Sequence, residues 1–107
     1  MDYYMIISTI DNKEIGIDMA KNLINKNLAA CVNIIDQITS VYKWKGKMET
    51  INEYMLLIKT TADKKQKTIE KIKTLHPYEL PEIISFKIEG GDEEYLKWVN
   101  EISGGKK

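Results

Sequence analysis

The side chains best suited to metal chemistry are few, and three of them lie in residues 76–82, a segment with two prolines. His76 is the single histidine, Cys31 is the single cysteine, and Glu79 and Glu82 follow His76 closely. Imidazole, thiolate and carboxylate bind transition-metal ions, and a closed structural site needs about four such ligands. The chain has no C-x-x-C or H-x-x-H spacing. A metal site therefore requires His76 with Glu79 or Glu82, or ligands shared between chains.

Each of these residues also has a structural interpretation. A histidine in the last turn of a helix can hydrogen-bond exposed carbonyls and interacts favourably with the helix dipole. Cys31 has small apolar neighbours and is typical of a buried core residue. Glu79 and Glu82 lack an assigned nucleophile or second base, which is typical of polar loop contacts. We favour the structural roles, keep His76 and Glu79 as candidate metal ligands, and predict that the protein is not an enzyme.

The composition limits the classes of partner. Sixteen lysines balance sixteen acidic residues, and there is no arginine. Balanced charge gives no overall attraction to nucleic acid or to an anionic membrane, and the bidentate anion clamp of arginine is absent. A single cysteine forms no internal disulfide, and no apolar stretch approaches the ~20 residues that cross a bilayer. We predict a cytoplasmic protein with no membrane partner.

The first half of the chain predicts the elements that must position these residues. An apolar, β-rich run over residues 3–10 is typical of a central strand buried on both faces. Asp11 begins a capping-box pattern, which predicts a helix ending near Asn27 in a left-handed turn. Residues 30–44 then alternate with period two, and a break at 36–37 predicts a β-bulge.

The second half predicts a returning strand, a helix, a strand and a last helix. They are expected at 49–61, from Asp63 to the residue before Pro77, at 83–88, and after the cap Asp92, with 103–107 as a frayed tail. The order β-α-β-β-α-β plus a terminal helix is the ferredoxin-like motif, an α+β sandwich with both crossover helices on one sheet face. We predict that residues 1–107 form one domain.

The predicted hairpin around the turn at 45–47 is too long for an isolated chain. A strand over residues 30–44 would extend ~50 Å at ~3.3 Å per residue, whereas a domain of this size has a radius of gyration near ~13 Å. Ile38, Tyr42 and Trp44 would be carried beyond the core, and exposed apolar arms with free edges normally pair with another chain. We predict that these three side chains form a subunit interface, and that Trp44 is exposed in a single chain.

An ordered series of motifs identifies a family. The series comprises AACVN at 29–33, SVYKWKGK at 40–47, Glu53, Lys59 with Thr60, HPYELPE at 76–82 and YLKW at 95–98. It resembles the CutA divalent-cation-tolerance family over essentially the whole chain. The resemblance implies a homotrimer of ferredoxin-like subunits, similar to the PII proteins, whose long hairpins pair with neighbouring sheets. It also implies a cytosolic protein in the response to metal ions, without an established reaction.

The resemblance also implies copper binding, and small ligands or metal ions in the clefts between subunits. Members credited with copper binding have a cysteine where this chain has Ser8 and a second histidine where it has Leu75. Of the residues in that copper site, this chain has His76.

Two other functions compete with this interpretation. Basic and aromatic residues interleave at 43–47, so Lys43, Trp44 and Lys45 would suit a single-stranded nucleic acid by stacking and phosphate contacts. The zero net charge and the lack of paired aromatic strands weigh against nucleic acid as a partner. An acylphosphatase-like enzyme also fits the fold, but its phosphate cradle would need an arginine.

Overall fold

The computed structural model describes residues 1–104 of the protein. Its elements are β1 (Tyr3–Ile10), α1 (Lys13–Asn25), β2 (Cys31–Trp44), β3 (Lys47–Thr61), α2 (Ala62–Leu75), β4 (Ile83–Ile88) and α3 (Glu93–Ser103). The order of strands and helices is the predicted one, and the ferredoxin-like fold with a C-terminal helix is confirmed. The part of the chain described here includes no helix long and apolar enough to span a membrane.

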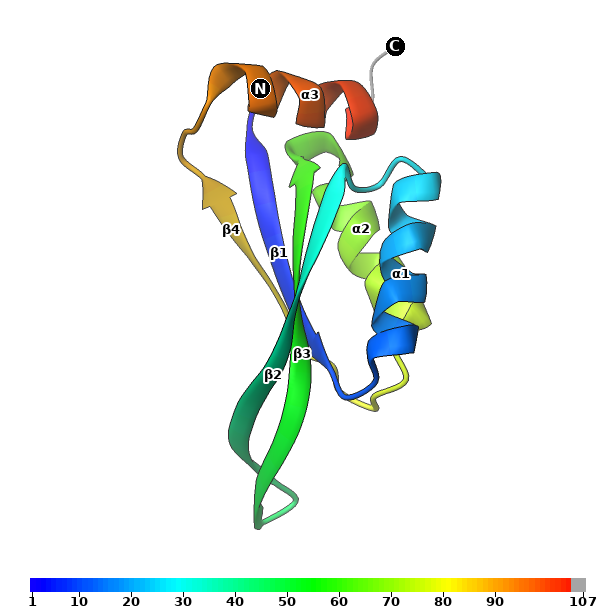
Figure 1. Ribbon diagram of the computed structural model, residues 1–107, viewed down its shortest axis with the longest axis vertical. Coiled ribbons are helices and arrows are strands. Elements are labelled where there is room, and N and C mark those ends of the chain that lie inside the picture. The colour runs from blue at the N-terminus through cyan, green and yellow to red at the C-terminus, as the bar shows by residue number, and fades with distance from the viewer. Residues whose placement is uncertain (105–107) are drawn as a thin grey trace.

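The four strands form one antiparallel sheet in the order β2-β3-β1-β4, so β1 is an inner strand as predicted. Figure 1 shows α1 and α2 side by side on one face of the sheet, and α3 across one end. The β2–β3 hairpin continues well past the other two strands (Figure 1). It makes the subunit elongated, with extents of 47 × 24 × 21 Å.

The hydrophobic core lies between the sheet and the two helices on that face. Alternate sheet residues Ile6, Ile10, Leu56 and Ile58 point into it, and Met19, Leu23 and Ile72 meet them from the helices. Fully burying one such side chain contributes about 1.5–3 kcal/mol to folding. Because side chains alternate along a strand, the residues between them must point to the opposite face.

Left-handed backbone occurs where the sequence predicts turns. Asn27 ends the α1 turn with φ 58°, and Gln37 has φ 56° at the bulge between Ile35 and Ile38. In the hairpin turn Lys45 has φ 51° and Gly46 has φ 81°. Two consecutive residues with positive φ match the right-handed twist of the flanking strands, which explains glycine at the second position.

Two predicted helix starts are wrong by a residue or two. The N-cap of α1 is Asn12, whose side chain accepts a hydrogen bond from the backbone N–H of Ile15 at 3.0 Å. Asp11 is therefore not the cap, and α2 begins at Ala62 rather than at Asp63. Asparagine and aspartate cap helices about equally well, so adjacent candidates cannot be separated from sequence.

The predicted frayed tail does not begin at Ser103. Ser103 is the last residue of α3 and is fully buried. Its carbonyl oxygen accepts hydrogen bonds from the Thr61 hydroxyl at 3.3 Å and from the Lys64 ammonium at 3.0 Å. The rest of that prediction, at 105–107, lies outside the described residues. The C-terminal helix is thus tied to the start of α2.

Replacing Lys64 by methionine tests this tie. The Lys64 ammonium also donates to the carbonyl of Asn27 at 3.1 Å, so one side chain joins the ends of α1 and α3. Lys64→Met should lower the free energy of unfolding by about 1–2 kcal/mol and increase amide exchange in α3. Urea denaturation and hydrogen exchange measure both effects. Lys67→Met, an exposed change on the same helix, should change neither, and equal behaviour of the two variants would contradict the assignment.

Candidate functional site

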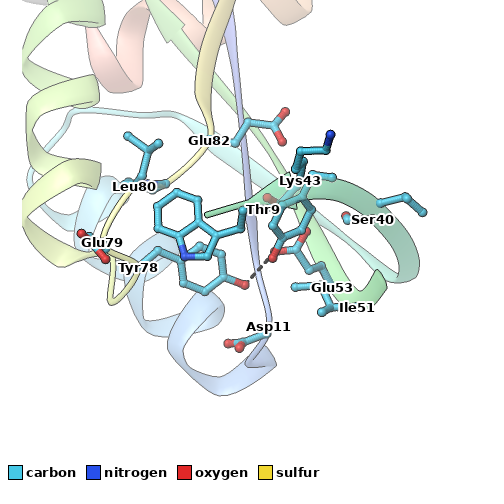
Figure 2. Close-up of a pocket in the computed structure, with 14 residues that line it drawn as sticks. Thr9, Asp11, Ser40, Lys43, Ile51, Glu53, Tyr78, Glu79, Leu80 and Glu82 are labelled. Atoms are coloured by element: carbon cyan, nitrogen blue, oxygen red, sulfur yellow. Dashed lines mark hydrogen bonds between the residues drawn. The ribbon is translucent and has the colours of Figure 1, made fainter. Parts of the chain in front are cut away.

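A pocket of about 870 Å³ lies between the β2–β3 hairpin and the loop before β4 (Figure 2). Its lining residues are Ser40, Val41, Tyr42, Lys43, Trp44, Ile51 and Glu53 from the hairpin, Thr9 and Asp11 from the end of β1, and residues 78–82 from the loop. Small-molecule sites in proteins have volumes of about 300–1,000 Å³. The pocket is thus large enough for a small ligand.

A buried carboxylate bonded to a phenol lies in this pocket. Glu53 on β3 is only 4% exposed, and its Oε2 accepts a hydrogen bond from the Tyr78 hydroxyl at 2.7 Å (Figure 2). Tyr78 is held in a loop that contains Pro77 and Pro81, whose rings restrict the backbone. Burial, reinforced by the bond to Glu53, raises the pKa of Tyr78 well above its ordinary value. The phenol therefore stays protonated and serves as a donor.

His76 is the C-cap of α2 and only 7% exposed. Its Nε2 lies 2.7 Å from the carbonyl oxygen of Thr9, and its Nδ1 accepts from the backbone N–H of Tyr78 at 3.2 Å. Because a carbonyl only accepts, the proton is on Nε2 and the Nδ1 lone pair is used. Both ring nitrogens have partners, so His76 fastens the loop to β1. This is the structural role favoured above, with a β1 carbonyl as acceptor.

Lys45 in the hairpin turn lies between Glu79 of the loop and the Trp44 ring. The Glu79 Oε1 lies 3.8 Å from the Lys45 ammonium, which itself is 5.6 Å from the centroid of the Trp44 ring. Trp44 is only partly exposed and lines the same pocket as the loop. The expectation of an exposed Trp44 in a single chain is therefore wrong, because Trp44 lies beside the 78–82 loop of its own chain.

The predicted metal ligands are not gathered in this chain. Within residues 1–104, no group of three or more His, Cys, Asp and Glu side chains is placed to hold a metal ion. Cys31 is half-buried with its Sγ 3.9 Å from the Lys59 ammonium, so it is not the core residue that we predicted. Ser8 is fully buried, and its hydroxyl oxygen has no hydrogen-bond partner in the described chain.

One face of the sheet has no helix layer. Cross-strand partners show that it carries a band of apolar side chains, namely Met5, Ile7, Ile35, Met55, Leu57, Ile84 and Phe86. Ile35 is 43% exposed, Ile84 45% and Phe86 49%. Contiguous apolar surfaces of this kind mark interaction sites. Ile38 and Tyr42 of the predicted interface continue the same face along the hairpin, because the bulge keeps Ile38 in phase with Ile35.

Sequence reasoning missed the pairing of Glu53 with Tyr78. The two residues stand 25 positions apart, so no local spacing joins them. A possible signal was an acidic residue inside the apolar returning strand, where a charge needs a partner. Glu79, the predicted ligand, is largely exposed and paired with lysine instead.

The pairing predicts an alkaline dependence of stability. The raised pKa of Tyr78 makes its contribution complete below pH ~10, the unfolded value, and lost as the pH rises above that. The free energy of unfolding should fall more steeply above pH ~10 in the parent than in Tyr78→Phe, as measured by urea denaturation at several pH values. Tyr3→Phe, which removes a hydroxyl outside the pocket, should keep the parent slope. Parallel curves for Tyr78→Phe and the parent would refute the assignment.

Several proteins have sequences similar to this one. The chain is 48% identical over 94 residues to "Protein CutA homolog" of Xenopus laevis, covering 88% of this chain and 62% of that protein. It is 41% identical over 100 residues to "Divalent-cation tolerance protein CutA" of Thermus thermophilus, covering 94% and 97%. The chain spans about half the length of its mammalian and plant relatives, for example 54% of mouse "Protein CutA".

Solved structures share the fold. CutA1 from Oryza sativa superposes with a TM-score of 0.94 at 38% identity, covering 99% of this chain and 97% of that one. The structure described as periplasmic divalent cation tolerance protein CutA from Archaeoglobus fulgidus gives 0.90 at 36% identity, covering 94% and 98%. The family described as "CutA1 divalent ion tolerance protein" matches residues 4–102. The chain therefore belongs to the CutA1 divalent ion tolerance protein family.

Proposed function

We propose that the protein is a homotrimeric binding module in the response to divalent metal ions and catalyses no reaction. The names of the family and of the Thermus thermophilus relative specify divalent ion or cation tolerance and name no reaction. The pocket supports a binding role, because it contains a buried carboxylate and phenol but no assembled nucleophile and base. In this proposal residues 1–107 act as one domain.

The main support for self-association is the sheet face that no helix covers. A half-exposed Phe86 and Ile84 on an edge strand, next to the apolar inner strands, are unfavourable in water. A second copy of the same face is apolar in the same way and can cover it. Three copies, each packing its face toward a common axis, would bury all of them in a closed assembly. The number three comes from the family resemblance.

The hairpin supports the same arrangement. Ile38, Tyr42 and Trp44 follow one face of β2, and Tyr42 is 40% exposed. The long strands leave backbone groups of β2 unpaired on its outer edge, because β2 is the last strand of the sheet. A neighbouring subunit can pair with that edge. We propose these three side chains as hairpin contacts between subunits.

The metal role is proposed at the level of the family, with copper as the candidate ion. His76 and Glu79 are the sequence-based ligand hypothesis. The contacts of His76 weigh against it, since ligation would break the bond to Thr9 or the bond from Tyr78. Ligands contributed by several subunits are the alternative.

A cytoplasmic location is also part of the proposal and is supported by the single free cysteine. Relatives carry other names, such as chloroplastic in rice and periplasmic in Archaeoglobus fulgidus. Nucleic-acid binding through Lys43, Trp44 and Lys45 is not supported. Trp44 lines the pocket, so its ring is not free to stack on a base. Lys45 is paired with Glu79, so its ammonium is not free for a phosphate.

Disrupting the apolar sheet face should dissociate the assembly. Light scattering after size exclusion should give about 37 kDa for the parent, three times the chain mass of 12.4 kDa. Phe86→Glu should give the single-chain mass, because burying an unpaired carboxylate in the interface costs several kcal/mol. The control Ile15→Glu changes an apolar residue that is 37% exposed on α1, on the helix side of the sheet. It should stay trimeric, and a monomeric parent would rule out the proposal.

Copper titration separates the two ligand hypotheses. His76→Ala should lower the melting temperature, because it removes the bonds to Thr9 and Tyr78, but its copper affinity should equal the parent's. Calorimetry with Cu²⁺ on the folded variant measures the affinity, with Glu79→Gln as a second variant. Loss of copper binding in folded His76→Ala would instead establish His76 as a ligand.

A further inference from the structure

We infer that Glu49 on the hairpin of one subunit forms an ion pair with Lys59 on the sheet of the next subunit. Both side chains lie on the sheet face that no helix covers, and no salt bridge among residues 1–104 involves either of them. The inference rests on the proposed self-association and names the contact that gives it a direction. Each copy offers one carboxylate and receives another on its ammonium.

The strand register places both residues on the uncovered face. Glu49 of β3 pairs with Tyr42, and Lys59 of the same strand pairs with Cys31 on one side and Met5 on the other. Paired residues of neighbouring strands share a face, and so do alternate residues of one strand. The extra residue of the bulge belongs to β2, so the alternation along β3 is unbroken from Glu49 to Lys59.

This face carries few charges. Within the four described strands, its side chains on β1, β2 and β4 are uncharged. On β3 it carries Lys47 at the turn, then Glu49, Glu53 and Lys59. Glu53 is occupied, because its carboxylate accepts from Tyr78 and is only 4% exposed. Glu49 is therefore the carboxylate that the hairpin can offer to another copy, and Lys59 is the ammonium at the other end of the face.

One chain cannot bring these two charges together. They are ten positions apart on a single strand, which corresponds to about 33 Å at ~3.3 Å per residue. Figure 1 shows the hairpin turn and the end of β3 beside α3 at opposite ends of the subunit. Pairing of Glu49 with Lys59 therefore needs a second copy of the chain.

Lys59 has neutral neighbours in its own chain. Its ammonium donates to the side-chain oxygen of Asn33 and lies 3.9 Å from the Cys31 sulfur. Met5 and Phe86 continue the same row across the sheet and are apolar. A subunit that covers this row removes the ammonium from water, and a charge buried without a counter-charge is unfavourable. A carboxylate supplied by the covering subunit offsets that penalty.

Glu49 is placed to be that carboxylate. It is half-buried and lies directly across from Tyr42, on the same side of the hairpin as Trp44. Packing of these aromatic rings on a neighbour brings Glu49 to the same surface. A contact that joins the hairpin of one copy to the sheet of the next is head-to-tail, and head-to-tail contacts can close into a ring. In a closed ring every Glu49 and every Lys59 has a partner.

Exchanging the two charges tests the pair. Light scattering after size exclusion, at a series of protein concentrations, gives the concentration at which half of the trimer dissociates. Glu49→Lys and Lys59→Glu should each raise that concentration at least about tenfold, because like charges then meet at every interface. The variant that carries both changes should return to within about threefold of the parent, since opposite charges meet again. The controls Lys67→Glu and Glu70→Lys reverse exposed charges on α2 and should dissociate like the parent.

Failure of the double variant to recover, or parent-like assembly of either single variant, would overturn the inference. If the reversed variants do not fold, as judged by circular dichroism, a double-mutant cycle of Glu49→Gln and Lys59→Gln decides. Their combined effect on dissociation should be smaller than the sum of the separate effects, and additive effects would contradict the pair. A monomeric parent contradicts the proposed self-association itself, whereas a trimeric parent without recovery contradicts this contact alone.

Discussion

The sheet has two apolar faces, and the chain has a helix layer for one of them. Ile6, Ile10, Leu56 and Ile58 are sealed by α1 and α2, whereas Ile35, Ile84 and Phe86 on the other face stay 43–49% exposed in the single chain. Successive side chains of a strand point to opposite faces, and the chain has apolar residues at both sets of positions. Something must cover the second face, and the family to which the chain belongs suggests further copies of the chain.

The hairpin links this constraint to the pocket. The hairpin has a bulge at Gln37 and a turn with two residues of positive φ, and its residues 40–44 line one pocket with the 78–82 loop. His76 fixes the loop, because it is bonded to Thr9 of β1 and to Tyr78 of the loop. One hydrogen-bond chain from β1 through the loop to Glu53 therefore positions the pocket. The histidine acts as a scaffold for the pocket, whose lining includes the Glu53 carboxylate and the Tyr78 ring.

Local patterns made most of the fold predictable. Period-two and helical spacing, Pro77, Gly46 and the bulge each left a sequence signal, and their order specified the ferredoxin-like topology. Adjacent capping candidates such as Asp11 and Asn12 differ by contacts that only the folded chain decides.

The candidate site was less predictable because it depends on contacts between distant residues. Glu53 meets Tyr78 only after the hairpin curls, and Trp44 is covered by a loop more than thirty residues later in the sequence. His76 was a candidate metal ligand, and in the structure both of its ring nitrogens are bonded to backbone groups. Its partners, a β1 carbonyl and a loop N–H, are backbone groups that every residue carries, so the sequence could not reveal them.

Covering of the second sheet face is the central claim, and hydroxyl-radical footprinting at micromolar concentration tests it most directly. In a single chain Phe86 is 49% exposed and Leu80, on the loop, is 70% exposed. If other copies cover the face, Phe86 should react as a buried side chain while Leu80 reacts freely. Reaction of Phe86 in proportion to its exposure in the single chain would contradict it.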